Sequence, residues 1–506
     1  MLRPVTLIED LKPYSVLRHP APITYSLENN ECLLNQAFDV NSLITKDTIR
    51  KYPSKLELEQ LIATKYQLSP SQVIVGAGGD DVLERFSKAV LEEGREIILP
   101  VPTFEMIERY AYFTKAKIIK VKWEDRYPIE EVVSKINKDT AVITVVSPNN
   151  PNGLIIAPEE LVRISQAATN SLILLDLAYT EFAEIDLTDL ALTLKNVVVF
   201  RTFSKAWALA GLRVGYALGP ENVISWMKTV ANPYSVSGVT LEIAKHILSN
   251  GESEVEKRVS LIKQERAELE NLFQELGENI IHSEGNFIFV RSARALWIWQ
   301  ALSGLGIAIR QFGNKEYLEN CLRIACPGDG VIFKKLIAGI KGAYLPQALL
   351  FDLDGTLVSL TAFFASRRNP QISLQEILLV EIELLQQLKS KFKLGIVTSC
   401  AKEEAEEVLL NLGLKDIFDV LVTPDEAPSK PDPRSVQYAL KQLNVESAWM
   451  VGDTTRDIKA ARNAEVVPLG ILHGAENFSL NESSLLKAGA AKVLKNISEL
   501  GELIYV

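Results

Sequence analysis

Three apolar runs in the first half of the chain constrain its fold most strongly. They are AVITVVSP (141–148), SLILLDLAY (171–179) and NVVVFRTFS (196–204), and few polar residues interrupt them before they end. Strands that are covered on both faces are typically apolar throughout, whereas strands with one face in water alternate apolar and polar residues. The runs therefore predict a parallel sheet between layers of helices, which is an α/β fold.

The rest of this region fits the same alternation of strands and helices. A helix is expected over 80–91, and Gly251 to Leu276 has the pattern of one long amphipathic helix. Ligands of open α/β sheets bind at the carboxyl ends of the strands, so polar residues that follow the apolar runs are candidates for a site. Further strands are expected at 73–78, 96–100, 117–123, 286–291 and 321–325.

The composition is that of a globular protein with more than one core. At 506 residues the chain is too long for one ordinary domain, and 47% hydrophobic with 23% charged residues leaves little room for a long disordered tail. The net charge of −10 argues against a nucleic-acid partner, because a phosphate backbone requires a basic face.

Signals for export or for a membrane are not found in the sequence. The segment MLRPVTLIEDLKPY has acidic residues and an early proline where a signal peptide has an apolar run. No window approaches the ~20 apolar residues of a membrane span. The cysteines form no CxxC pair and no ligand set with histidine, which fits free thiols in a reducing compartment. We therefore expect a cytoplasmic protein with no membrane partner. The cysteines are Cys32, Cys321, Cys326 and Cys400.

The segment RTFSKAWALAGLRVGY (201–216) carries the most specific chemical signal. Lys205 follows small hydroxyl residues, and Arg213 comes a few positions later. Such a lysine can form a Schiff base while Ser204 and Arg213 hold a phosphate nearby. Pyridoxal 5'-phosphate (PLP) has both an aldehyde and a phosphate and meets both requirements.

Together with other motifs in the same order, this segment resembles the fold-type I PLP enzymes, and within them the histidinol-phosphate aminotransferases. The resemblance covers about residues 10–342. It implies a class I/II aminotransferase domain over 1–345, with a large and mainly parallel sheet and a small lobe from 1–45 and about 245–342. It also implies a homodimer with shared sites.

The same resemblance implies roles for individual residues. Lys205 would bind the cofactor aldehyde and move the α-proton of the substrate, and Asp176 would pair with the pyridine nitrogen. Tyr179 and Asn150 match groups that hydrogen-bond the ring oxygen, and Phe104 matches the aromatic residue that stacks on the ring. Further cofactor-binding residues would be Gly78, Gly79, Asp80, Thr202, Ser204, Arg213 and, from the neighbouring subunit, Tyr52.

The residues for the substrate match the family less completely. Arg323 in CLRIA matches the clamp for a carboxylate or phosphate, a task that suits a bidentate guanidinium. Arg310 is a second candidate for an anion contact, and Asn286 lies where the family has a residue near the substrate. LENNECLL (27–34) is a poor match to the Asn-Glu-Asn-Pro substrate loop. Amino transfer is therefore better supported than the identity of the amino donor.

A second set of motifs follows a short boundary at Lys341–Gln347. FDLDGTL (351–357), VTS (397–399), SKPDP (429–433) and VGDTTRD (451–457) resemble the haloacid-dehalogenase-like phosphatases, especially the phosphoglycolate-phosphatase-like branch. The resemblance implies a Rossmann-like α/β hydrolase domain over 346–506. Its strands are expected near 348–353, 393–398, 419–422, 448–452 and 466–471.

The roles in this second site also come from the resemblance. Asp352 would attack phosphorus, and Asp354 would protonate the leaving oxygen and then activate water. Thr398 and Lys430 would bind the phosphoryl oxygens. Only about 44 residues separate Asp354 from Thr398, including a helix expected over 371–389, which predicts a minimal cap. Mg²⁺ would be held by Asp352, Asp354 (through its carbonyl), Asp453 and Asp457.

The motifs together predict a bifunctional biosynthetic enzyme that acts on a small phosphorylated amino or keto substrate. A PLP-dependent aminotransferase would be joined to an Mg²⁺-dependent phosphatase. Histidinol phosphate fits both steps, because transamination forms it and hydrolysis converts it to histidinol. Two alternatives stay open: a threonine-phosphate-decarboxylase-like lyase with the same phosphatase, and a PLP-binding sensor with an inert hydrolase module.

Overall fold

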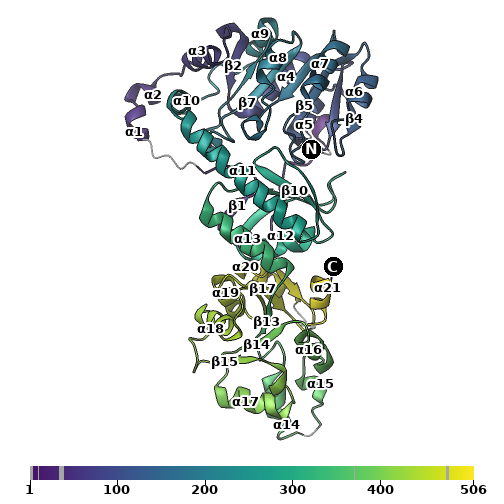
Figure 1. The fold of residues 1–506 in the computed structure, drawn as a ribbon, viewed down its shortest axis with the longest axis vertical. Coiled ribbons are helices and arrows are strands. Elements are labelled where there is room, and N and C mark those ends of the chain that lie inside the picture. The colour runs from purple at the N-terminus through teal and green to yellow at the C-terminus, as the bar shows by residue number, and fades with distance from the viewer. Residues whose placement is uncertain (1–3, 10, 34–38, 370, 474–477, 506) are drawn as a thin grey trace. The chain divides into compact units, whose positions relative to one another are not determined.

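A computed structural model describes residues 4–9, 11–33, 39–369, 371–473 and 478–505 of the chain, which form two compact units (Figure 1). Unit 1 comprises Met1–Ser15, Asn29–Arg291 and Phe312–Asp329, and unit 2 comprises Val16–Glu28, Ser292–Gln311 and Gly330–Val506. The assignment of 1–345, with its small lobe, to a transferase domain and of 346–506 to a hydrolase domain stays a prediction.

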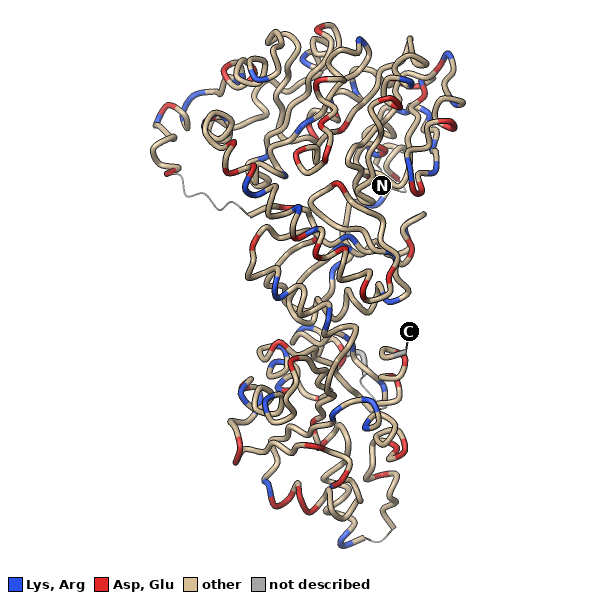
Figure 2. The backbone as a smooth tube through the Cα atoms, in the orientation of Figure 1, with Lys and Arg blue, Asp and Glu red and all other residues tan. Residues whose placement is uncertain are grey.

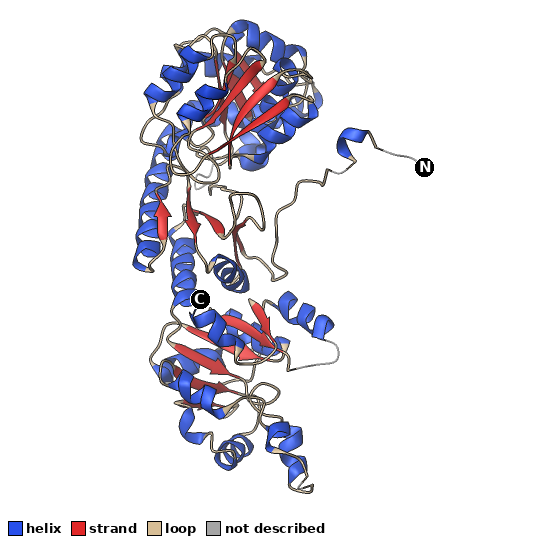
Figure 3. Ribbon diagram, turned by 90° about the vertical axis from the view of Figure 1, so that its right-hand side faces the viewer, coloured by secondary structure: helices blue, strands red, loops and turns tan. Residues whose placement is uncertain are grey.

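A seven-stranded sheet with helices on both faces forms the centre of unit 1 (Figure 3). Its neighbouring strands are parallel except at β8, which is antiparallel to both β2 and β7. Every residue of β2, β3, β7 and β8 is buried. The predicted parallel sheet between helix layers is thus confirmed. In sheet order the strands are β2 (Val73–Gly76), β8 (Gly215–Leu218), β7 (Val197–Thr202), β6 (Leu172–Asp176), β5 (Thr140–Val146), β3 (Glu96–Val101) and β4 (Lys117–Lys122).

Helix α4 illustrates how a helix of unit 1 buries one apolar face. Val82, Phe86 and Val90 of α4 recur at four-residue spacing and are buried, and the Phe86 ring meets Phe200 of β7 edge-on at 5.3 Å. The expected long helix is present as α11. The helices are α1 (Val40–Leu43), α2 (Lys46–Arg50), α3 (Leu56–Lys65), α4 (Gly78–Val90), α5 (Glu105–Phe113), α6 (Ile129–Lys135), α7 (Pro158–Ala167), α8 (Thr188–Leu192), α9 (Glu221–Thr229), α10 (Gly238–Asn250) and α11 (Glu252–Glu275).

Three more strands complete unit 1 after α11. β10 (Phe287–Arg291) pairs antiparallel with β9 (Asn279–Ile281) and with β12 (Cys321–Ala325). β10 and β12 lie where the sequence predicts strands. In both units Lys and Arg are interspersed with Asp and Glu along the described chain (Figure 2).

Unit 2 is built on a six-stranded sheet whose neighbouring strands are all parallel. The parallel strands β1 (Tyr25–Leu27) and β11 (Ile307–Gln311), which lie outside this six-stranded sheet, also belong to unit 2. The sheet order is β15 (Val420–Val422), β14 (Lys393–Val397), β13 (Ala348–Phe351), β16 (Ala448–Gly452), β17 (Val467–Ile471) and β18 (Lys492–Leu494). The helices are α12 (Ala295–Gly304), α13 (Gly330–Tyr344), α14 (Leu360–Ser366), α15 (Leu374–Ile377), α16 (Ile382–Lys389), α17 (Lys402–Asn411), α18 (Arg434–Leu443), α19 (Thr455–Asn463), α20 (Phe478–Ala488) and α21 (Glu499–Tyr505).

The helix expected over 371–389 is two helices, α15 and α16, so this part of the prediction is wrong. A capping box between Ser373 and Glu376 starts α15. At Leu378 the backbone becomes extended and forms an isolated bridge with Val358. The helix stops there because the neighbouring backbone groups bond to the loop after Asp354: the carbonyl of Ile377 accepts from the N–H of Ser359 at 2.8 Å, and the N–H of Leu379 donates to the carbonyl of Leu357 at 3.0 Å. Within the described ranges, no helix has both the length and the apolar character of a membrane span.

The start of α4 and strand β8 approach each other so closely that only glycine fits between them. A Cβ on Gly215 would lie 2.6 Å from the backbone C of Gly78 and from the backbone N of Gly79. Backbone atoms cannot rotate away as a side chain can. The first residues of α4 therefore lie directly against β8.

We expect Gly215→Ala to lower the free energy of unfolding by about 1–3 kcal/mol, the usual cost of overpacking. Thermal unfolding of the full chain measures this change. Gly211→Ala is the matched control, because a Cβ on Gly211 would meet no atom within 4 Å. Equal thermal midpoints for Gly215→Ala and Gly211→Ala would contradict the close approach of α4 to β8.

Candidate active sites

The predicted cofactor residues lie at the carboxyl end of the seven-stranded sheet. Asp176, the last residue of β6, pairs in register with Val146 of β5 and with Phe200 of β7. The segments that carry Asn150 and Lys205 follow directly after β5 and β7. The sheet thereby brings together three functional segments that are distant in sequence.

Asp176 is a buried carboxylate with few partners of its own. It is 6% exposed, and its Oδ1 accepts a hydrogen bond from the backbone N–H of Ala178 at 3.0 Å. Burial raises the pKa of Asp176 to about 6. A cationic group beside this carboxylate would offset the cost of burying its charge, so the site fits a ligand with a protonated ring nitrogen.

An anion-binding arrangement surrounds the N-terminus of α4. Gly78, at φ +89°, opens the helix, and a Cβ there would lie 2.6 Å from Nη2 of Arg213. The Arg213 guanidinium donates to Asp80 Oδ2 at 2.9 Å and to Ser204 Oγ at 3.4 Å. The Oγ1 of Thr202 in turn accepts from the backbone N–H of Ser204 at 3.0 Å. Helix N–H groups, a guanidinium and hydroxyls in one place suit a phosphate.

Lys205 and Tyr179 are held by the N-terminal segment that matched the family poorly. The Lys205 Nζ donates to the carbonyl of Asn29 at 2.8 Å and lies 5.5 Å from the centre of the Tyr179 ring. Asn30 Nδ2 donates to the Tyr179 hydroxyl at 3.0 Å. The sequence analysis missed Asn29 and Asn30, and the available signal was the Asn-Asn pair itself, since Asn30 has φ +57° and asparagine tolerates that conformation.

Asn286 fixes this segment from the other side. Its Nδ2 donates to the Asn30 carbonyl at 3.1 Å and to the Cys32 sulfur at 3.4 Å. Burial raises the pKa of the Cys32 thiol to about 11, so this cysteine stays protonated. Asn30 and Asn286 are completely buried, and the Oδ1 of each accepts no hydrogen bond from the described residues. Such orphaned acceptors fit a site that is completed by a bound molecule.

Arg323 and Asn150 also meet in the structure. Nη1 of Arg323 donates to Asn150 Oδ1 at 2.5 Å, and the guanidinium lies 5.5 Å from the centre of the Phe287 ring. Arg323 is 6% exposed, so its charge is held in a largely dry environment. Arg310 is also buried, but it lies on β11 in unit 2.

The two remaining predicted cofactor residues lie at different depths in unit 1. Phe104 precedes α5 and packs, partly buried, against the apolar core beside the sheet. Tyr52 is 81% exposed and stacks on Tyr234, with ring centres 4.4 Å apart.

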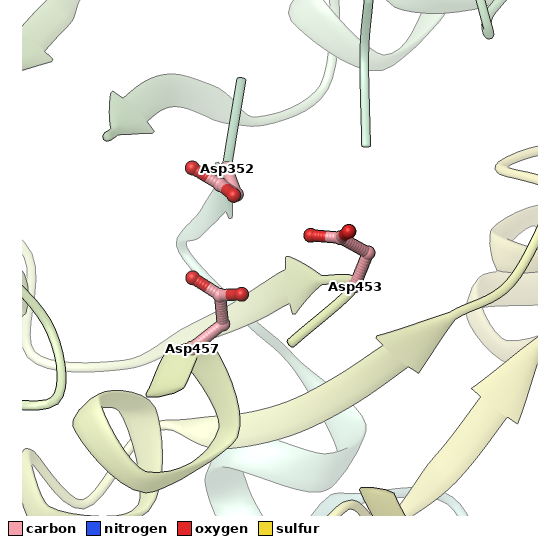
Figure 4. Close-up of side chains that lie close together, drawn as sticks. All are labelled: Asp352, Asp453 and Asp457. Carbon is pink, nitrogen blue, oxygen red and sulfur yellow. The ribbon is translucent and has the colours of Figure 1, made fainter. Parts of the chain in front are cut away.

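The predicted hydrolase residues gather at the carboxyl ends of β13 and β16. Asp352 follows β13, Asp453 follows β16, and Asp457 lies in the first turn of α19 (Figure 4). Lys430 reaches between two of these carboxylates: its Nζ lies 2.6 Å from Asp352 Oδ1 and 2.5 Å from Asp457 Oδ1. Burial alone would lower the pKa of Lys430, but Asp352 and Asp457 raise it above its usual value.

The three aspartates form a group that could hold a divalent cation. Each offers an oxygen, and these oxygens all lie within 4.8 Å of one another. Burial raises the pKa of Asp352 to about 6 against the opposing effect of Lys430. Burial and the two neighbouring aspartates raise that of Asp453 to about 7. Oδ1 of Asp453 is buried without a hydrogen-bond partner among the described residues. Three carboxylates against one lysine leave excess negative charge, which Mg²⁺ with its preference for oxygen ligands would offset.

Asp354 and Thr398 border this group. Asp354 does not contribute its side chain to the three-carboxylate group, since Oδ1 accepts from the backbone N–H of Leu360 at 2.9 Å. Thr398 is 4% exposed, and its Oγ1 accepts from the backbone N–H of Cys400 at 3.1 Å. The sequence analysis missed Arg456, whose Nε donates to the carbonyl of Lys430 at 2.8 Å and thereby ties that lysine to α19.

Comparison with known sequences finds a family match in each part of the chain. Residues 25–330 match the aminotransferase class I and II family. Residues 376–471 match the haloacid dehalogenase-like hydrolases, a range that begins after Asp352 and Asp354. The histidinol-phosphate aminotransferase of Thermoanaerobacter pseudethanolicus is 31% identical over 330 residues, which cover 63% of this chain and 92% of that protein.

Solved structures share the fold of the transferase part. The PLP complex of histidinol-phosphate aminotransferase from Sinorhizobium meliloti has a TM-score of 0.60 at 23% identity and covers 67% of this chain and 97% of its own. An L-threonine-O-3-phosphate decarboxylase from Porphyromonas gingivalis has a TM-score of 0.54 at 19% identity and covers 63% and 98%. The predicted fold-type I architecture and the predicted fusion are thus confirmed. The chain belongs to the aminotransferase class I and II family and is an enzyme with a transferase part and a C-terminal hydrolase part of the haloacid dehalogenase-like type.

Proposed function

We propose that the chain is a bifunctional enzyme: a PLP-dependent aminotransferase for a small phosphorylated substrate, joined to an Mg²⁺-dependent phosphatase. One observation carries the transferase proposal. Lys205, the buried carboxylate Asp176 and the anion-binding start of α4 all adjoin the carboxyl edge of one sheet. PLP has a functional group for each of them: an aldehyde, a ring nitrogen and a phosphate.

Bound PLP would supply a ring that withdraws electrons from the α-carbon of the substrate. Asp176 would keep the ring nitrogen protonated, because its buried charge gains from a cationic neighbour. Asn30 donates into the Tyr179 hydroxyl, so the single proton of that hydroxyl is free to be donated to a ring oxygen. Lys205 would hold the aldehyde and then carry the α-proton.

Histidinol phosphate is our proposed substrate, because the similar protein of Thermoanaerobacter pseudethanolicus is named a histidinol-phosphate aminotransferase. Arg323 would bind an anionic group of the substrate, and Asn150 would hold its guanidinium in place. Arg310 is proposed as a second anion contact. Asn286, with its unpartnered amide oxygen, would offer an acceptor to a donor group of the substrate.

In the hydrolase part, Asp352 would attack the phosphorus of the product, and Asp354 would protonate the departing oxygen and later activate water. Lys430 neutralises part of the charge around Asp352, and Thr398 would bind a phosphoryl oxygen. Mg²⁺ held by Asp352, Asp453, Asp457 and the Asp354 carbonyl would offset the charge of the phosphoryl group.

We further propose a homodimer in which Tyr52 reaches the cofactor phosphate of the neighbouring subunit. The exposed ring of Tyr52 and its stacking partner Tyr234 support this assignment, since exposed aromatic side chains are common in protein interfaces.

A half-reaction tests the transferase proposal. PLP-loaded protein is mixed with L-histidinol phosphate without a keto acid, and Mg²⁺ is chelated to silence the phosphatase. We expect the visible absorbance to convert from that of the lysine-bound aldehyde to that of the amine form. Lys205→Ala should lack the lysine-bound absorbance, and Lys257→Ala, at an exposed helical lysine, should behave as wild type.

An unchanged wild-type spectrum would remove histidinol phosphate as the donor. Release of carbon dioxide from threonine phosphate without a keto acid would instead support the lyase alternative. If no phosphorylated amino compound were turned over, the only remaining alternative would be a PLP-binding sensor with an inert hydrolase module.

Asp352→Asn should abolish phosphate release and leave the half-reaction unchanged, because the amide is a poor nucleophile and unit 1 contains the cofactor residues. Colorimetric phosphate release with histidinol phosphate and Mg²⁺ measures this. Asp425→Asn is the control, since Asp425 is exposed and lies outside the three-carboxylate group. Phosphate release by Asp352→Asn at the wild-type rate would refute the assignment of Asp352 as the nucleophile.

Asn30→Ala should slow the half-reaction about tenfold, because the buried Tyr179 hydroxyl loses a donor, at a typical cost of about 1–3 kcal/mol. Single-turnover absorbance measures the rate. In a Tyr179→Phe background the same substitution should have little further effect. Additive effects would show that Asn30 does not act through Tyr179.

A further inference from the structure

The hydrolase module, residues 346–506, does not enclose its apolar core by itself. A single cluster of buried side chains includes Leu349, Phe351 and Trp449 of the module together with Trp297 and Ala343, which precede it in the chain. α12 is buried at eight of its ten positions, including Trp297, Trp299 and Gly304. A helix that is apolar on nearly all sides requires neighbours on more than one face.

The neighbours of α12 come from both sides of residue 346. The helix contacts β11 and α13, and it also contacts β17 and β18 of the hydrolase sheet. α13 likewise contacts β17. α12 and α13 are thus a layer shared by the β1–β11 pair and the hydrolase sheet.

Two tryptophans make the most specific contact in this layer. The rings of Trp297 and Trp449 meet edge-to-face with centres 4.9 Å apart. Trp449 Nε1 donates to the carbonyl of Gly342 at 2.8 Å, and Trp297 Nε1 donates to the carbonyl of Ala343 at 2.9 Å. A buried indole N–H without an acceptor is costly, so both tryptophans require the end of α13 in this position.

Polar contacts extend the same interface. Arg294 donates to the carbonyl of Leu503 at 2.8 Å, and His19 Nε2 lies 3.0 Å from the carbonyl of Ala491. Burial lowers the pKa of His19, which favours a neutral ring that donates here. Arg462 of α19 donates to the carbonyls of Gly304 and Pro22.

The connection between α13 and β13 is itself fixed. Gln347 Oε1 accepts from the backbone N–H groups of Glu446 and Ser447, at 2.7 and 3.2 Å. Ser447 Oγ donates to the carbonyl of Leu345 at 3.2 Å. A flexible linker would leave its backbone groups to water.

We propose that β1, β11, α12 and α13 fold and move as one cooperative unit with the hydrolase module. The module is then not an independent domain, and Arg310 on β11 moves together with the nucleophile Asp352. This inference depends on packing and does not require either proposed activity.

Native-state hydrogen exchange of the full, PLP-loaded chain tests whether these four elements unfold together with the hydrolase module. Trp297→Ala should reduce the protection of amides in β13 and β16 by the same factor as in α13. Leu296→Ala is the matched control on the same helix, because the Leu296 side chain is 52% exposed. This variant should leave amide protection unchanged both in β13 and β16 and in α13. Loss of protection confined to α12, α13 and β11 would overturn the proposal.

A pair of glycines tests the interface without removing a large side chain. A Cβ on Gly304 would lie 2.9 Å from the Ala491 Cβ and 3.1 Å from its backbone N, whereas a Cβ on Gly501 would meet nothing within 4 Å. Alanine usually stabilises a helix relative to glycine. Gly501→Ala should therefore raise the thermal midpoint of hydrolase inactivation, and Gly304→Ala should lower it. A rise with Gly304→Ala would show that Ala491 is not seated on α12 and would overturn the proposal.

Discussion

Main-chain hydrogen bonding between β6 and the strands on either side of it sets the arrangement of the proposed cofactor site. The register fixes Asp176 beside Val146 and Phe200, so the three chain segments that leave the sheet there must converge. The side chains are then oriented by local contacts, such as that of Arg213 with Ser204. A shift of one residue in β6 would turn Asp176 to the opposite face of the sheet.

The two proposed sites apply the same physical principle to different reactions. In each, an aspartate that ends or follows a parallel strand is buried, and burial raises its pKa to about 6. Such a carboxylate is stable in its charged form only beside a positive partner. Lys430 supplies part of this charge at Asp352, whereas Asp176 has no comparable cation within hydrogen-bonding distance among the described residues. Asp176 is therefore the carboxylate that depends more on a bound ligand.

Much of the fold, and the residues of the two candidate sites that the structure brings together, could be predicted from the sequence because long apolar runs and ordered motifs are local signals. The runs that became β5, β6 and β7 are examples, as are FDLDGTL and VGDTTRD. Short strands such as β8 and β18 were missed, because three or four residues carry no clear periodicity. The helix expected over 371–389 was broken by a tertiary bridge between Val358 and Leu378. The Asn-Asn pair favours a turn at Asn30, but no local pattern could reveal that its side chain contacts Tyr179, 149 residues away.

The indole of Trp449 bonds to a carbonyl that lies before the motifs of its own hydrolase family begin. A chain divided at residue 346 would therefore lose a buried hydrogen bond and would expose Trp297 on one product and Trp449 on the other. Each product would present a new apolar surface, and large exposed apolar surfaces promote aggregation. For this chain, a cut at the family boundary would open a core, whereas in a chain with a solvated linker it would only shorten the linker.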